Sequence, residues 1–316
     1  MNEKGDPANM KKIISAVLTV LMLFSLFVPA LAETADTSSF RVAAPSGAPA
    51  LALATLAAEA PDQYTFVLAE TIAAEFSGAT ADFLIAPINA GAKLYKAGKS
   101  TYKLAAVVSW GNLFFASQKE NFKLEDLNGA DVTLFGENTI NASVALFALE
   151  QSGIKPASVS YLAGAANTQQ LLLSDENAIV LTAEPALTAA RMKNDRITAF
   201  SVNELYKAAT GFDGYTQAGL FIRGDVAENQ AEAANAYLRL VEASCARCTE
   251  DVDAVAEAAV ALEILPNAKV ARAAIPGCAI RFLSAPEAKE QVERTANIDL
   301  SQYGGAVPAD DFYYGL

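Results

Sequence analysis

The chain has 316 residues, a formal net charge of −13 at pH 7, three cysteines and no histidine. The absence of histidine excludes Ser-His-Asp and Cys-His mechanisms and removes the commonest zinc ligand. Such an acidic chain is a poor candidate for binding nucleic acid or an anionic membrane, because both require a basic surface. The length allows a large core in one domain or two.

Residues 1–32 have the pattern of a signal peptide. A short basic stretch precedes the unbroken apolar run 13–28, and an Ala-x-Ala cleavage pattern ends at Ala32. A transmembrane anchor is the alternative, but the run is short for a spanning helix and Pro29 follows it. No cysteine ends the run, which argues against a lipid anchor. We predict cleavage before Glu33 and a periplasmic or secreted protein.

From Phe40 onward, short apolar runs alternate with helical patterns. A first series has strands at 40–45, 64–70, 81–86, 102–110 and 112–117, with helices at 48–60 and 88–98. After a polar stretch, 118–129, a second series has strands at 130–136, 157–164, 177–185 and 196–202, with helices at 139–153, 167–176 and 203–210. A further strand is expected at 215–223, and only helices beyond it. This alternation predicts α/β architecture with mostly parallel sheets and helices on both faces.

The second series interrupts the first, which predicts two lobes with a cleft between them. Two crossing segments, near 115–119 and 217–221, would join the lobes. We expect lobe I to comprise residues 33–117 plus 219–316, and lobe II to comprise residues 118–218.

Five strand-to-helix junctions carry small and polar residues. They lie at 44–50, 86–92, 109–112, 136–143 and 181–186. Each alone is explained by a turn or a helix cap, but all five fall at the same end of their strands. In open α/β sheets, ligands bind beyond the carboxyl ends of the strands, near helix N-termini. No GxGxxG motif follows a strand, so a nucleotide site has little support.

The cysteines are Cys245, Cys248 and Cys278, and the first two form a CxxC pair. The pair is either a redox or metal motif, or two thiols on a long helix that begins near Val226. Because no histidine completes a ligand set, we favour the structural role and expect neither a metal nor a cofactor. In an exported chain, one thiol of the pair could form a disulfide with Cys278, and this alternative is left open.

Several segments together resemble substrate-binding proteins of bacterial ABC importers, in the group of alkanesulfonate, nitrate/taurine and thiamine-precursor binders. The segments are "RVAAPSGAPALALATL", "ADFLIAPINAGAKLYKAG", "WGNLFFAS", "LEDLNGADVTLFGENTINASVALFALEQSGI", "YTQAGLFIR" and "AVPADDFYY". The resemblance implies a type II periplasmic-binding-protein fold that closes over a small molecule and serves an ABC permease. It places the ligand-binding residues at Ser46, Gly47, Ala48, Pro87, Ile88, Asn89, Trp110, Gly111, Asn112, Asn138, Thr139, Asn141, Ala142, Thr182 and Glu184. The chain lacks the Cys-rich run of the thiamine-precursor relatives.

The resemblance leaves the ligand and the exact role open. Helix N-termini favour anions, whereas Glu184 among the junctions and the absence of Lys or Arg there favour a neutral or amine-bearing solute, with a ring stacked on Trp110. We expect a monomeric binding protein without catalytic residues. The alternatives are a menaquinone-biosynthesis-like enzyme with Glu184 as its base, and a sensory binding protein.

Overall fold

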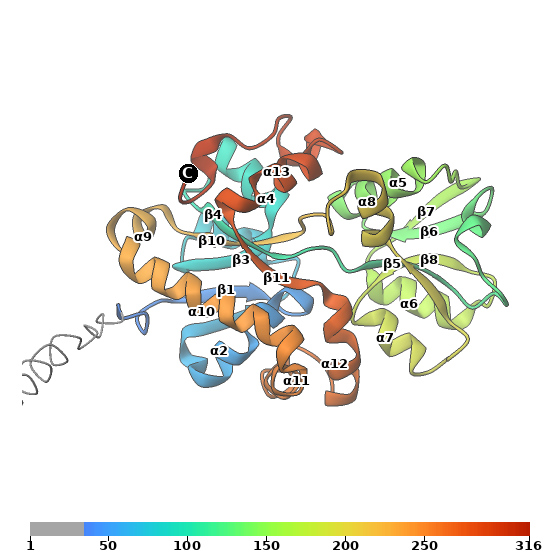
Figure 1. Ribbon diagram of the computed structural model, residues 1–316, viewed down its shortest axis with the longest axis horizontal. Helices are drawn as coiled ribbons and strands as arrows, with labels where there is room; N and C mark the ends of the chain where they lie inside the picture. Colours follow the sequence, from blue (N-terminus) through green and yellow to red (C-terminus); the bar gives the residue numbers. More distant parts are fainter. Residues whose placement is uncertain (1–34) are drawn as a thin grey trace, which may run out of the picture. The chain divides into compact units, whose positions relative to one another are not determined.

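The computed structural model describes residues 35–316, and residues 37–316 form one compact unit. This unit contains two β-sheets with helices packed around them (Figure 1). The expected signal peptide, residues 1–32, lies outside the described residues. Within residues 35–316, no helix combines the length and the apolar character needed to cross a membrane.

Lobe I, as we use the term below, is the six-stranded sheet with its helices. The strand order is β11-β4-β10-β3-β1-β2. The strands are β1 (Val42–Pro45), β2 (Tyr64–Val67), β3 (Phe83–Pro87), β4 (Lys103–Ser109), β10 (Ala218–Ile222) and β11 (Ile280–Ser284). The helices are α2 (Ala54–Glu59), α3 (Glu75–Gly78), α4 (Ile88–Lys96), α9 (Gly224–Asn229), α10 (Ala231–Glu250), α11 (Val252–Ala261), α12 (Ala268–Ala274) and α13 (Ala285–Ala296).

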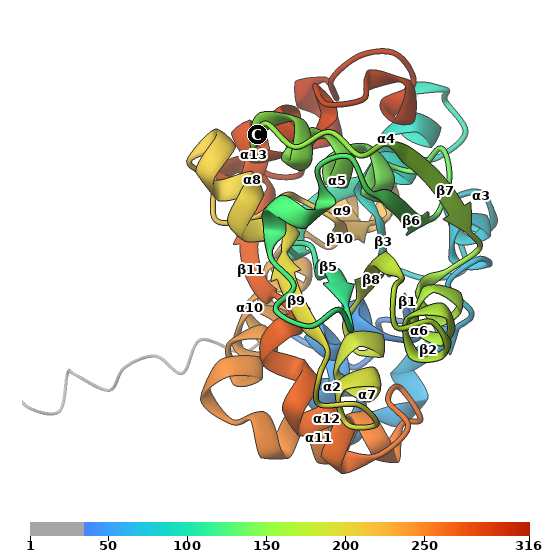
Figure 2. The same ribbon diagram turned by 90° about the vertical axis from the view of Figure 1, so that its right-hand side faces the viewer.

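Lobe II is the five-stranded sheet with its helices, in the order β7-β6-β8-β5-β9. In Figure 2 this lobe faces the viewer, with α5 and α8 on one side of the sheet and α6 and α7 on the other. The strands are β5 (Leu113–Ser117), β6 (Asp131–Phe135), β7 (Ser158–Leu162), β8 (Ile179–Ala183) and β9 (Thr198–Ser201). The helices are α5 (Ile140–Gln151), α6 (Ala165–Ser174), α7 (Ala186–Arg191) and α8 (Val202–Thr210).

Short 3-10 helices complete both lobes. They are η1 (Ala48–Leu53), η2 (Pro61–Gln63), η3 (Ile72–Ala74), η4 (Leu124–Leu127), η5 (Ile275–Cys278), η6 (Leu300–Tyr303) and η7 (Asp310–Phe312).

Local sequence explains where the main elements begin and end. The four residues Phe83 to Ala86 of β3 are fully buried, because helices cover both faces of the sheet, and Pro87 ends the strand. The helix α5 begins at a Thr139 cap, whose hydroxyl accepts from the Ala142 N–H at 3.4 Å. It ends just before Gly153, which has a positive φ of 72°.

Strand directions bring the carboxyl ends of the strands together. In lobe I, β1 and β3 are parallel, and β10 runs antiparallel to both β3 and β4, so β1, β3 and β4 end at one edge. In lobe II, β6, β7 and β8 end at one edge, where the antiparallel β5 begins. The first crossing, Trp110 to Asn112, therefore joins these two edges, and the second crossing, residues 211–217, returns to β10 at the edge of lobe I.

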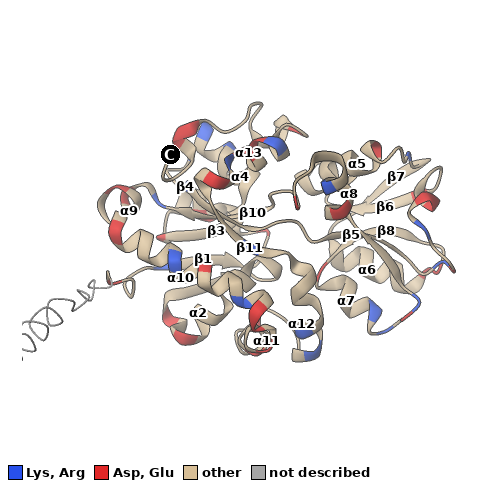
Figure 3. Ribbon diagram, viewed as in Figure 1, with Lys and Arg blue, Asp and Glu red and all other residues tan. Residues whose placement is uncertain are grey.

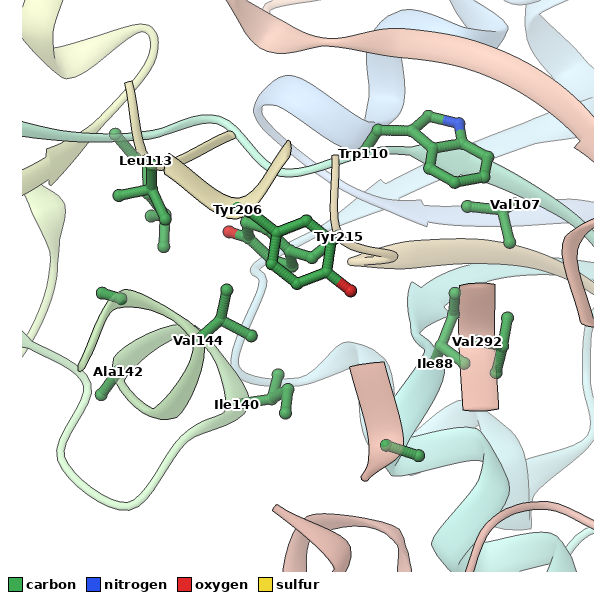
Figure 4. Packing of buried hydrophobic residues seen from close by; sticks show 14 of the residues in the cluster. Ile88, Val107, Trp110, Leu113, Ile140, Ala142, Val144, Tyr206, Tyr215 and Val292 are labelled. Atoms are coloured by element: carbon green, nitrogen blue, oxygen red, sulfur yellow. The ribbon is translucent and has the colours of Figure 1, made fainter. Parts of the chain in front are cut away.

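The apolar core continues from one lobe into the other. Ile88 of lobe I and Ile140 of lobe II belong to one cluster of buried side chains. Tyr215 of the second crossing packs against Tyr206 of α8, with ring centroids 6.1 Å apart, and Figure 4 shows both rings between the two lobes. Each lobe therefore contributes apolar surface to the junction.

The structure confirms the α/β fold class and corrects several details. The sheets are mixed, because β10, β11, β5 and β9 run against their neighbours. The strand at 113–117 belongs to the second sheet, so the lobe boundary lies before it and not after residue 117. Its apolar residues fit a buried strand in either sheet, so periodicity could not assign it.

The expectation of only helices after residue 223 is wrong, since β11 forms the edge of the first sheet. This strand contacts one neighbour and is buried only at Ile280, so its sequence lacks the apolar run of a central strand. The helix expected from Val226 into the 240s is two helices, α9 and α10, separated at Gln230.

Candidate functional site

The junctions of lobe I lie where expected, at the ends of β1 and β3. Ser46 is exposed, and its backbone N–H donates to the Val67 carbonyl at 2.8 Å. Gly47 and the buried Ala48 start η1. At the second junction, Pro87 is exposed and caps α4, Ile88 is buried, and Asn89 is half-buried. Among the described residues, the Asn89 side chain has no hydrogen-bond partner.

Trp110 differs from the expected stacking surface. Its side chain is only 1% exposed, its Nε1 donates to the Arg281 carbonyl at 2.7 Å, and the Arg281 guanidinium lies 4.2 Å from the ring centroid. One face of the ring is thus already occupied by a cation. Because the whole side chain is buried, neither face of the ring is open to a stacked solute in this structure.

The two crossings and α5 meet in a cluster of amide side chains. Gln217 Nε2 donates to Asn112 Oδ1 at 3.4 Å and to Asn141 Oδ1 at 3.2 Å. Ser109 Oγ donates to Gln217 Oε1 at 3.2 Å, and the buried hydroxyl of Tyr215 lies 3.5 Å from Asn141 Oδ1. We call Asn112, Asn141 and Gln217 the amide cluster. It joins both crossings to lobe II through neutral groups.

The first turn of α5 forms the lobe II side of this cluster. Asn138 is exposed with a φ of 58°, and Thr139 Oγ1 donates to the Gly136 carbonyl at 2.6 Å. Asn141 is half-buried and Ala142 is buried. The Thr139 side chain is therefore engaged in capping, and Asn141 is the polar side chain of this turn that reaches the crossings.

Glu184 lies at the end of β8 and is 7% exposed. Its carboxylate accepts from the Thr188 N–H at 3.0 Å and from Thr188 Oγ1 at 2.8 Å. Burial raises the pKa of Glu184, against the opposing effects of the Thr188 hydrogen bonds and the Arg191 charge. Its backbone exchanges two hydrogen bonds with Asn112: Asn112 Nδ2 donates to the Glu184 carbonyl at 2.7 Å, and the Glu184 N–H donates to the Asn112 carbonyl at 3.0 Å.

Two further groups at this edge show how tightly the lobes approach. A Cβ at Gly277 of η5 would lie 3.0 Å from Glu184 Cγ, so lobe I packs directly on this side chain. Thr182 is fully buried, and its hydroxyl has no hydrogen-bond partner among the described residues. The carboxylate of Glu184 is thus held by Thr188 of the following helix, α7, while the hydroxyl of Thr182 has no partner among the described residues.

Charge is sparse at the junctions. None of the fifteen predicted residues is Lys or Arg, and Figure 3 shows the charged residues mainly on helices and loops around the sheets. Within residues 35–316, no group of three or more His, Cys, Asp or Glu side chains could hold a metal ion. The cysteines are free and buried, and burial raises the pKa of Cys248 to about 12. The CxxC pair lies in the core of lobe I, as expected of structural thiols.

The structure brings some of the predicted residues together and leaves others apart. Asn112 contacts both Glu184 and Gln217. In the described chain, no hydrogen bond joins Ser46, Pro87 or Asn89 to lobe II. A cavity of about 390 Å³ between α4 and residues 306–312 is lined by none of the fifteen predicted residues. Sequence reasoning missed Gln217 as a site residue, although a polar residue at the start of a crossing strand is a detectable signal.

Comparisons with solved structures bear on the fold of this chain. Neither a protein family profile nor a curated protein matches the sequence. An ABC transporter protein from Parabacteroides distasonis is 20% identical with a TM-score of 0.74, covering 87% of this chain and 98% of its own. The alkanesulfonate-binding protein SsuA from Xanthomonas axonopodis pv. citri, bound to MOPS, is 15% identical with a TM-score of 0.62, covering 86% and 96%.

A third structure is the ligand-binding component of an ABC-type import system from Staphylococcus aureus with zinc bound. It is 11% identical with a TM-score of 0.65, covering 87% of this chain and 95% of its own. At these identities the similarity concerns the fold. Residues 37–316 therefore have the two-lobed α/β fold of ABC-importer binding proteins, the group that the sequence resembles.

Proposed function

We propose that this protein is an extracytoplasmic solute-binding protein. It would capture a small organic molecule between lobes I and II and deliver it to an ABC permease. The fold of the ABC import components supports the general role. The export signal expected in residues 1–32 supports the location.

The observation that carries the proposal is the amide cluster. It draws one polar side chain from the first crossing, one from the second crossing and one from the first turn of α5. A molecule bound between the lobes can hydrogen-bond to all three at once, and can do so best when the lobes are close. A ligand shifts an equilibrium between open and closed forms only through contacts that it makes better in one of them.

The proposed binding residues are those at the facing strand ends. Asn89 of lobe I and Asn141 of lobe II would contact the solute from opposite sides, with Asn112 and Gln217 between them. Glu184 would have a structural role, because its carboxylate is bound by Thr188. We assign no catalytic residue.

Mass spectrometry of small molecules released from the purified mature protein would identify the solute, and calorimetry would then test the site. Asn141→Ala removes a half-buried hydrogen-bonding group, which typically costs about 1–3 kcal/mol, so binding should weaken roughly ten- to a hundredfold. Asn229→Ala is the matched control, because this amide donates to the Asp225 carbonyl in α9, in lobe I. Normal binding by Asn141→Ala would contradict the assigned site. Finding no solute, released or screened, would contradict the function.

A further inference from the structure

The short helix η6 is attached firmly to lobe I. Tyr303 is 1% exposed and belongs to the apolar core. Next to it, Lys96 Nζ of α4 donates to the Gly304 carbonyl at 2.7 Å. The segment 299–303 therefore packs against α4, whose first turn carries Asn89.

The same segment reaches the first turn of α5 in lobe II. Ser143 Oγ donates to Asp299 Oδ2 at 2.8 Å, and Gln302 Nε2 donates to the Asn138 carbonyl at 3.0 Å. These lobe II partners lie on either side of the Thr139 cap of α5. Figures 1 and 2 show the dark red chain that follows α13 close to α5.

The geometry at Asp299 suits a contact with a helix N-terminus. Its other oxygen, Oδ1, accepts from the Ser301 N–H at 3.1 Å and the Ser301 hydroxyl at 2.5 Å, so the carboxylate is held in orientation within its own segment. Oδ2, which accepts from Ser143 Oγ, lies at the N-terminal part of the 12-residue helix α5, where a negative charge is favoured. Lobe I thus presents a pre-oriented anion to lobe II.

We propose that residues 299–303 form a latch between the lobes, in which Asp299 and Gln302 are positioning residues that hold the α5 side of the solute site against α4. This inference rests on the proposed function, because it concerns how the same site closes. The latch contacts require no bound molecule. They stabilise the arrangement in which lobe I and lobe II lie together, so separating the lobes must break these two hydrogen bonds.

The test measures the distance between the lobes in the solute-free protein. Because the native cysteines are buried, spin labels attached at Lys193→Cys in lobe II and Glu228→Cys in lobe I react selectively. Electron–electron resonance would then compare the unmodified latch with Ser143→Ala/Gln302→Ala. Losing two hydrogen bonds, one of them to a carboxylate, should lower the ratio of closed to open protein about ten- to a hundredfold.

Ser152→Ala is the matched control. Ser152 lies just after α5 and donates to the carbonyl four residues earlier at 2.8 Å, as Ser143 does to Thr139 at 3.2 Å. Within residues 35–316, no hydrogen bond joins the Ser152 side chain to lobe I. Its distance distribution should stay unchanged. An unchanged distribution in the double variant, or an equal change in Ser152→Ala, would overturn the latch. A shift seen only in the double variant supports the latch even if no solute is ever found, which would count against the proposed function alone.

Discussion

Replacing Gly111 with Ala should destabilise the junction of the two lobes. Gly111 has a φ of +80°, and an added Cβ would lie 2.1 Å from Cε1 of the buried Tyr215 ring. A left-handed conformation costs an L-residue about 1–2 kcal/mol, and forcing extra volume into a packed core costs about 1–3 kcal/mol. Together these effects should lower the free energy of unfolding by about 2–5 kcal/mol.

The control is Gly98→Ala, where φ is +66° and no atom lies within 4 Å of the added Cβ. It should show only the conformational cost. Urea unfolding and thermal melting of both variants would separate the two effects, and each kcal/mol corresponds to about 2–4 °C in Tm. Equal losses in the two variants would show that Tyr215 does not pack against Gly111 as described.

Two further predictions concern buried polar groups at the end of β8. Burial raises the pKa of Glu184 in the folded protein, so protonation of this carboxyl at low pH stabilises the fold. This contribution to the free energy of unfolding is lost as the pH rises through the raised pKa. Glu184→Gln should therefore have a higher free energy of unfolding than the wild type at neutral pH. Urea unfolding from pH 7 downward should show this difference shrinking. A difference that grows on acidification would contradict the burial effect. Thr182→Val should raise the unfolding free energy by about 1 kcal/mol, since it removes an unpaired buried hydroxyl at nearly constant volume, and a loss of stability would reveal a partner such as bound water.

The sequence predicts the elements of this fold well where apolar runs are unambiguous. β3 follows Asp82 and ends at a proline, so its position and the junction that follows can be inferred from the sequence pattern alone. β11 could not be inferred, because an edge strand that contacts one neighbour needs no continuous apolar run. The sequence analysis placed β5 in lobe I, whereas it belongs to lobe II, because the apolar pattern of a buried strand does not show which of two sheets the strand joins.

The candidate site shows the same division. The strand-end positions follow from topology, which places loops at the carboxyl edge of each sheet. The partners of each side chain do not follow, because Gln217 and Asn141 are 76 residues apart and meet only when the two lobes are set against each other. The packing of the Arg281 guanidinium on the Trp110 ring is likewise a tertiary contact, between residues that are far apart in the sequence.

The position of β10 has a consequence for how the chain folds. This strand lies between β3 and β4 in the centre of the first sheet, yet it follows all of lobe II in the sequence. Until residues 218–222 arrive, β3 lacks a neighbour on one side and β4 lacks both, because its other partner, β11, follows later still. Their backbone groups on these sides remain unpaired. During synthesis or translocation from the N-terminus, lobe II, continuous in sequence, can fold first, while lobe I must wait for the chain to return.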